Sequence, residues 1–193
     1  MRVPALLLVL LTAACAGPPG PAQDATNAKG VASPGQSPGE SPGGEPIKLT
    51  GAGEFTTDDT SAIVYDRKLA PEGSQASVTV ESSGGQTRTS LVVEGLLPNR
   101  RYGSHLHVNP CGKKPEAAGP HFQHHTGQIN PSSEVWLDLT TDAEGAGRST
   151  SRNDWTLTQA KLPGSLVIHS DPTVTSGPKV GEAGARVACL TLK

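Results

Sequence analysis

The sequence predicts an all-β domain built as an antiparallel sandwich or barrel, and three observations support this fold class. Short segments rich in β-branched residues follow one another after Leu49, with glycine, proline and asparagine between them. Some of these segments alternate apolar and polar residues with a period of two, as a half-solvated antiparallel sheet requires. No stretch shows sustained helical periodicity, so helices are not expected to contribute to the core.

Eight segments are predicted to be strands. They cover residues 61–69, 75–82, 87–95, 103–108, 134–141, 145–151, 164–169 and 185–192. In the second segment Val78 and Val80 lie on one face, and in the third Leu91 and Val93 do the same. Residues 140–147, TTDAEGAG, are typical of a hairpin loop. Because aromatic residues are only 3% of the chain, the core is expected to be mainly aliphatic.

The chain divides into three parts. Residues 1–14 have the pattern of a secretory signal, with Arg2 before an apolar run and small residues leading to Cys15. The pattern resembles a bacterial lipobox, which predicts cleavage before Cys15 and lipidation of that cysteine; the alternative is an ordinary signal cut near Ala14. Residues 15–48 are rich in proline, glycine and serine and are predicted to be a disordered tether. Residues 49–193 form the predicted domain.

This organisation predicts an exported protein. It would be anchored to the extracytoplasmic side of the cell membrane through lipid on Cys15, or secreted. In an oxidising compartment, the two remaining cysteines, Cys111 and Cys189, are most simply one disulfide. The net charge of −2 and the absence of a long basic run exclude nucleic acid as an expected partner. Nothing in the sequence indicates an oligomeric state.

Histidines are the main candidates for chemistry. His105 and His107 are separated by one residue in a predicted strand, so both imidazoles lie on one face. His121 follows in AGPHF, and His169 ends another strand. Imidazole ligands suit copper and zinc. A metallo-β-lactamase pattern is not met, because Asn109 stands where an aspartate is needed. A blue-copper site would need a methionine, and none remains after export.

These residues carry a resemblance to a known family. The order GSHLHV, CG, AGPHF, LVIH and GEAGARVACLTL is similar to that of the secreted bacterial copper/zinc superoxide dismutases, over about residues 60–193. The resemblance implies an eight-stranded Greek-key β-sandwich and a superoxide anion as substrate. It also implies a disulfide between Cys111 and Cys189, and Arg186 as the residue that guides and holds the anion. The implied copper ligands are His105, His107, His121 and His169.

The resemblance further implies that His121 bridges copper to zinc and exchanges a proton with the substrate. The zinc region departs from the family, because the loop QHHTGQINPSSEVWL is short and its two histidines, His124 and His125, are adjacent. At most one of them is expected to serve a second metal, together with His121 and a carboxylate such as Glu134 or Asp138. The sequence therefore leaves zinc binding open. The segment between His169 and Arg186 is also shorter than the charged loop of the family.

The implied function is an exported copper-dependent superoxide dismutase, working with copper alone if the zinc site is missing. One alternative is a non-catalytic copper-binding or copper-buffering lipoprotein on the same fold, and another is a structural domain that binds no metal. Arg186 and the cysteine pair favour the enzyme, because a copper buffer has no use for an anion guide. The altered zinc region favours the alternatives.

Overall fold

The computed structural model describes residues 45–193, and every structural statement below concerns that part of the chain. The predicted signal sequence, Cys15 and nearly all of the predicted tether lie outside the described residues. Within residues 45–193, no helix has the length and apolar character needed to cross a membrane.

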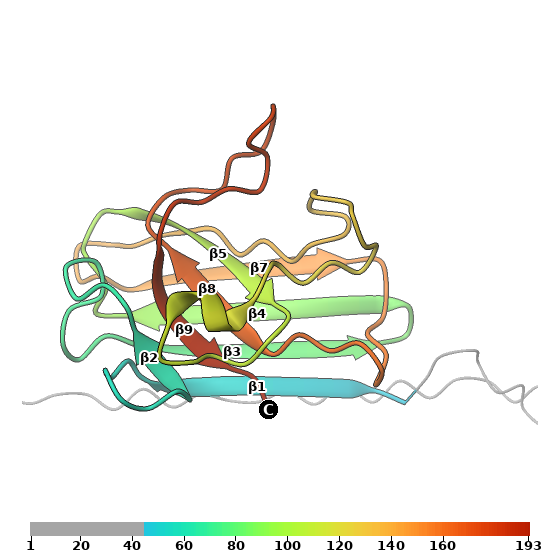
Figure 1. Cartoon of the computed structure of the whole chain (residues 1–193), viewed down its shortest axis with the longest axis horizontal. Coiled ribbons are helices and arrows are strands. Elements are labelled where there is room, and N and C mark those ends of the chain that lie inside the picture. Colours follow the sequence, from blue (N-terminus) through green and yellow to red (C-terminus); the bar gives the residue numbers. More distant parts are fainter. Residues whose placement is uncertain (1–44) are drawn as a thin grey trace, which may run out of the picture. The chain divides into compact units, whose positions relative to one another are not determined.

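Two antiparallel sheets form the domain (Figure 1). The first has the order β1-β3-β4-β7, and its strands are β1 (Ile47–Glu54), β3 (Gln75–Ser83), β4 (Gln86–Glu94) and β7 (Gly147–Asn153). The second has the order β2-β9-β8-β5-β6, and its strands are β2 (Ala62–Val64), β9 (Arg186–Thr191), β8 (Ser165–His169), β5 (Arg101–His107) and β6 (Leu139–Thr140). The helical element of the described residues is a short 3-10 turn, η1 (Pro115–Ala118).

The chain passes between the sheets in Greek-key fashion. It leaves the first sheet after β4, returns to pair β7 with β4, and crosses again to pair β8 with β5. Strand β9 then completes a hairpin with β8. This architecture confirms the predicted all-β class.

Alternating burial in β3 and β4 confirms the predicted period of two. Val78, Val80, Leu91 and Val93 are all buried, while the residues between them face outward or are partly covered. Burying apolar side chains on one face of each sheet supplies most of the driving force for a sandwich of this kind. The core between the sheets is mainly aliphatic, as the composition predicts.

The strand β1 was not predicted. Its sequence, IKLTGAGE, contains two glycines and reads as a loop, and it begins at Ile47, two residues before the expected start of the domain. The glycines are required by close packing: a Cβ on Gly51 would lie 2.7 Å from the carbonyl oxygen of Thr191. Strand β1 can therefore approach the end of β9 only because this position has no side chain.

Strands β5 and β8 are buried on both faces, unlike the strands of the first sheet. Their inner residues, such as Leu106 and Ile168, belong to the core. Their outer residues include His105, His107 and His169, which are covered by two long connections. The connection from β5 to β6 and the connection from β8 to β9 both project from the top of the molecule in Figure 1. The candidate site lies under these connections.

Candidate metal centre

Four histidines meet on the outer face of the second sheet. His105 and His107 come from β5, and His169 ends β8, where its backbone lies opposite Gly103 of β5. His121 comes from the long connection, and its backbone bridges to that of His107 across the edge of β5. One nitrogen from each of the four rings lies within 4.8 Å of every other. The cluster can therefore hold a metal ion.

The side-chain nitrogens that face away from the cluster each have a partner in the protein. His105 Nε2 lies 2.6 Å from the hydroxyl oxygen of Thr173, which in turn donates to Asp138. His107 donates from Nδ1 to the carbonyl of Gly119 at 2.9 Å, and His169 Nδ1 lies 3.5 Å from the carbonyl of Gly184. Such partners fix the tautomer and the orientation of a ligating imidazole.

The nitrogens left free by these partners point into the cluster. They are Nδ1 of His105 and Nε2 of His107, His121 and His169. His105 Nδ1 is buried with no hydrogen-bond partner, which is costly for a polar atom unless it binds something. His107 Nε2 and His169 Nε2 are 3.3 Å apart, close to the separation of two ligands on one metal ion. The residues present therefore fit a copper ion held by four imidazoles.

Burial keeps three of these rings neutral. It lowers the pKa of His105 far below its ordinary value, that of His107 to about 2 and that of His169 to about 4. Repulsion between neighbouring rings lowers the pKa values further. Neutral imidazole is the form that binds a metal, so the rings need not lose protons at neutral pH before an ion can enter.

Arg186 lies beside this cluster at the start of β9. Its guanidinium donates to the carbonyls of Pro115 and Gly119. Gly119 thus accepts from both Arg186 and His107, which couples the position of the arginine to that of a cluster histidine. Gly119 has a φ of +71°, and a Cβ there would lie 2.7 Å from the side chain of Asn109. The shared carbonyl therefore depends on glycine at this position.

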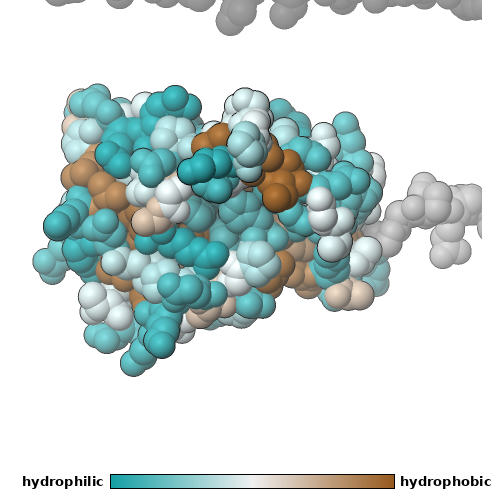
Figure 2. Space-filling view, turned by 45° about the horizontal axis from the view of Figure 1, so that its top comes forward, coloured by the Kyte–Doolittle hydropathy of each residue, from teal (hydrophilic) through white to brown (hydrophobic). Residues whose placement is uncertain are grey.

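A cleft of about 550 Å³ gives access to the cluster. His121, His169 and Arg186 line it, together with Ile129 from one projecting connection and residues 180–184 from the other. Figure 2 turns this end of the molecule forward and shows mostly polar side chains with separate apolar patches. A small anion entering the cleft would meet the guanidinium of Arg186 next to the two histidines.

Comparison with known proteins agrees with this geometry. The family model described as copper/zinc superoxide dismutase (SODC) matches residues 74–191, which is more than half of the chain. The chain belongs to the copper/zinc superoxide dismutase family. No curated protein matches the sequence significantly.

Two solved structures are similar in fold to this chain. The crystal structure of the clock protein EA4 is 20% identical, with a TM-score of 0.56, over 76% of this chain and 94% of that chain. The Cu/Zn superoxide dismutase from Brucella abortus is 21% identical, with a TM-score of 0.53, over 77% of this chain and all of the other. Both similarities concern the fold alone.

A buried carboxylate lies on the other side of His121. Glu134 is almost fully buried and accepts from His121 Nδ1 at 2.9 Å. Trp136 and Gln123 also donate to this carboxylate, each at 2.8 Å. Burial alone would raise the pKa of Glu134, but the hydrogen bonds from these three donors outweigh it, and the pKa lies below its ordinary value. The carboxylate is therefore held ionised beside Nδ1 of His121.

The adjacent histidines lie apart from this carboxylate. His124 stacks on Trp155, and its Nδ1 lies 3.3 Å from Nε2 of His125. Of the two carboxylates suggested for a second metal, Glu134 is occupied by His121, and Asp138 is bonded to Thr173. The structure thus does not gather the sequence-suggested zinc ligands into one cluster among the described residues.

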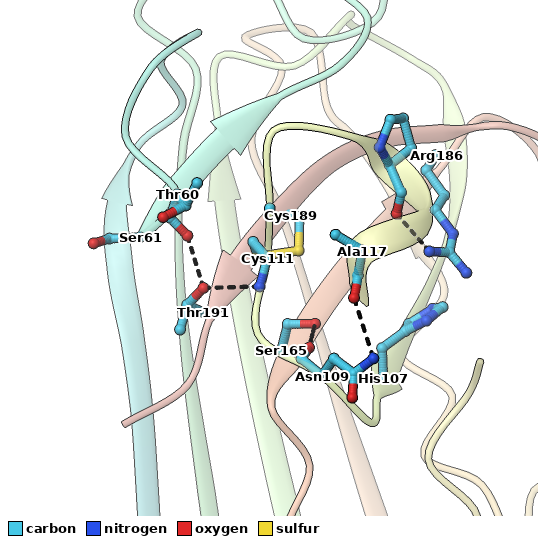
Figure 3. Close-up of a disulfide and its surroundings, with 12 residues drawn as sticks. Thr60, Ser61, His107, Asn109, Cys111, Ala117, Ser165, Arg186, Cys189 and Thr191 are labelled. Carbon is cyan, nitrogen blue, oxygen red and sulfur yellow. Dashed lines mark hydrogen bonds between the residues drawn. A yellow bond between two sulfur atoms is a disulfide. The ribbon is translucent and has the colours of Figure 1, made fainter. Parts of the chain in front are cut away.

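The disulfide joins Cys111 to Cys189 and fixes the loop that carries η1 (Figure 3). The backbone N–H of Cys111 also donates to the hydroxyl of Thr191, and Tyr65 donates to the carbonyl of Gly112. The same loop ends at Gly119, where it supports Arg186 and His107. A disulfide in a member of this family is consistent with an extracytoplasmic protein.

Several residues of the site had no signal in the sequence. Gln123 lies two residues after His121 and Thr173 four residues after His169, but neither they nor Trp136 belong to a metal-binding motif. Only the fold brings Thr173 to His105 and Trp136 to Glu134. Glu134 and Asp138 could be named from the sequence as nearby carboxylates, but not with these partners.

Proposed function

We propose that this protein is an exported superoxide dismutase that uses copper and works without zinc. The observation that supports this proposal best is that four histidines converge beside Arg186 at one cleft. In each of them, the ring nitrogen that faces away from the cluster has a partner in the protein. A copper ion bound there would supply the one-electron redox chemistry that converts two superoxide anions and two protons to oxygen and hydrogen peroxide. The ligands would be His105, His107, His121 and His169.

The role of Arg186 is to attract and orient the anion. Its guanidinium is half-buried and fixed by two backbone carbonyls, which leaves its remaining edge for a small anion. Burial lowers the pKa of Arg186 from its high ordinary value, yet the group remains a cation at neutral pH. The neighbouring connection offers little other attraction, since its one lysine, Lys179, pairs with Glu182 and Asp171 adds a negative charge. Orientation therefore depends mainly on Arg186.

The role of His121 is to exchange a proton at Nε2 within the cleft. Glu134 accepts from Nδ1 on the opposite side and so keeps that nitrogen protonated and the ring in one orientation. In this arrangement the carboxylate does the positioning for which the family uses zinc. A zinc ion is not needed to hold the ring.

The proposal is tested by loading the purified protein with copper, measuring metal content and assaying superoxide dismutation. We expect one tightly bound copper and activity well above that of free-solution background. An Arg186→Ala variant should keep its copper but lose roughly 10- to 100-fold in kcat/KM, because anion attraction is lost. Arg186→Lys serves as the matched control and should retain part of the activity and its salt dependence. Bound copper without activity would instead support the copper-buffering alternative.

The predicted anchor is tested separately. Lipidation at Cys15 predicts that a Cys15→Ala variant is released from the membrane fraction, whereas an ordinary signal peptide predicts no change. Mass spectrometry of the mature N-terminus distinguishes the two.

A further inference from the structure

We propose that His124 and His125 together form a second binding site for a divalent transition-metal ion, copper or zinc, separate from the four-histidine cluster. His124 Nδ1 and His125 Nε2 are 3.3 Å apart, and the rings are nearly perpendicular, at 83°. Two nitrogens bound to one tetrahedral ion at the usual Zn–N distance are separated by about 3.3 Å. One ion can therefore accept both nitrogens with little movement of either ring.

The backbone explains how adjacent side chains come to face each other. Neighbouring residues of a regular strand point to opposite faces, but this segment leaves the sheet and turns at Gly127, where φ is +85°. Ser133, which is fully buried, holds both histidines: its carbonyl accepts from the N–H of His124, and its hydroxyl accepts from the N–H of His125. The same hydroxyl donates to the carbonyl of His125. The backbone of both histidines is thus held by a buried residue.

Trp155 fixes the ring of His124. The two rings stack with centroids 4.6 Å apart and an angle of 8° between their planes. Trp155 is itself buried and donates from its indole nitrogen to the carbonyl of Ser132. A ligand ring that is already immobilised loses less conformational entropy when a metal binds.

The charges around the pair permit a cation to bind. Desolvation, with smaller effects from His125 and Lys161, lowers the pKa of His124, which favours the neutral form that binds a metal. Lys161 is a positive charge close to the pair, and its ammonium donates to the carbonyl of His124 and the hydroxyl of Thr126. Asp154 lines the same shallow depression as His125 and supplies a negative charge.

Only two protein ligands are available, so water would complete the coordination. The pair is therefore expected to bind more weakly than the four-histidine cluster and to exchange its metal with solvent. His121 takes no part, because its Nδ1 is bonded to Glu134. The inference does not depend on the proposed dismutase activity.

The chain has two tryptophans, and each lies beside one of the two sites. Trp136 is 6.1 Å from the ring of His105, and Trp155 stacks on His124. In a Trp136→Phe protein, the emission therefore reports Trp155 alone. Copper(II) bound to a stacked imidazole should quench this emission strongly.

The experiment titrates folded Trp136→Phe protein, first loaded with one equivalent of copper, with further copper(II). We expect one additional equivalent to bind and to quench most of the Trp155 emission. His124→Gln and His125→Gln should each weaken this second step at least tenfold. Lys161→Gln, the matched control, should leave it unchanged or make it tighter.

Either of two results would overturn the inference: no second equivalent, or a second equivalent that survives in the His124→Gln/His125→Gln double variant. Circular dichroism of each variant separates loss of binding from loss of fold. If the four-histidine cluster fails to load, the first equivalent itself quenches Trp155, and this quenching is lost in the double variant, so failure of the cluster can be distinguished from failure of the pair.

Discussion

The two nitrogens of His121 face opposite chemical environments. Nε2 faces three other imidazoles, all uncharged, with His105 Nδ1 buried and unpartnered. Nδ1 faces the carboxylate of Glu134, which is held ionised by three donors. On the Nε2 side the protein leaves a buried nitrogen of His105 without a partner, and on the Nδ1 side it satisfies a buried charge.

This difference indicates where a metal is needed. The unpartnered nitrogen of His105 is satisfied only when something such as an ion binds it, whereas the carboxylate of Glu134 is satisfied by protein donors. The proposed copper site thus lies on the side of the unpartnered nitrogen, and the protein's own side chains fill the side of Glu134. Four experiments test this asymmetry.

The largest expected effect comes from the cluster side. His105→Gln removes the buried Nδ1 that has no protein partner. Losing a ligand should exceed the 10- to 100-fold cost usual for losing an outer partner, so copper affinity and dismutase activity should fall by more than about 100-fold. Metal analysis after dialysis and a dismutation assay measure both. An active His105→Gln protein would contradict the assigned ligand set.

In the copper-free protein, the free energy of unfolding should depend on pH in different ranges for the cluster histidines and for Glu134. The folded pKa values of His107 and His169, about 2 and about 4, lie below the unfolded value of 6.5. Below about pH 6.5 the unfolded state therefore binds more protons, and the free energy of unfolding should fall as the pH falls, by up to about 1.4 kcal/mol per pH unit for each histidine.

Glu134 has a lowered pKa, so its contribution is present above the unfolded value of 4.5 and is lost only at lower pH. Urea unfolding of the copper-free protein between pH 7 and pH 4 should show the histidine phase first. The Glu134→Gln variant should keep that phase. A flat profile from pH 6.5 to pH 5 would show that the rings are protonated in the folded state.

The Glu134→Gln substitution removes the negative charge that accepts from His121 but keeps the size of the side chain. Loss of the charge should loosen the ring of His121 and lower copper affinity and kcat/KM by roughly tenfold. Gln123→Glu is unsuitable as a control, since it adds a second carboxylate beside Glu134, whereas Gln123→Met removes one donor and should have a smaller effect.

Thr173→Val tests the outer partner of His105 and should have the smallest effect. It removes the hydroxyl that lies between His105 and Asp138 but keeps the shape of the side chain. Copper affinity should fall by roughly 3- to 10-fold, below the loss in Glu134→Gln. Competition with a copper chelator measures it. A loss equal to that of His105→Gln would place Thr173 among the groups essential for binding.

The sequence predicted the parts of the fold and site that follow from local pattern. Val78, Val80, Leu91 and Val93 are buried because alternation along a strand fixes which face each side chain takes. His105 and His107 share a face for the same reason. Strand β1 was missed because its glycines are required by the approach of β9, and a single segment carries no information about its neighbour.

Two other parts of the chain also could not be predicted correctly from local pattern. The predicted strand at residues 134–141 is a strand only at Leu139–Thr140, since its earlier residues form isolated bridges that place Glu134 and Trp136 beside the histidines. The spacing of His124 and His125 gave no reason to expect that their rings face each other. That geometry depends on Ser133 and Trp155, which only folding brings near.

By itself, the sequence determined the all-β class, the family and the residue types available for a metal, because these depend on periodicity and on motifs of a few residues. The tertiary structure decided which nitrogen of each histidine is free and which is occupied. It did so through Thr173, Gly119, Glu134 and Gly184, which contact the rings from other segments of the chain. Whether a given ring nitrogen can bind a metal or instead donates a hydrogen bond is decided by its contacts in the folded protein. The identity of the residue alone does not determine it.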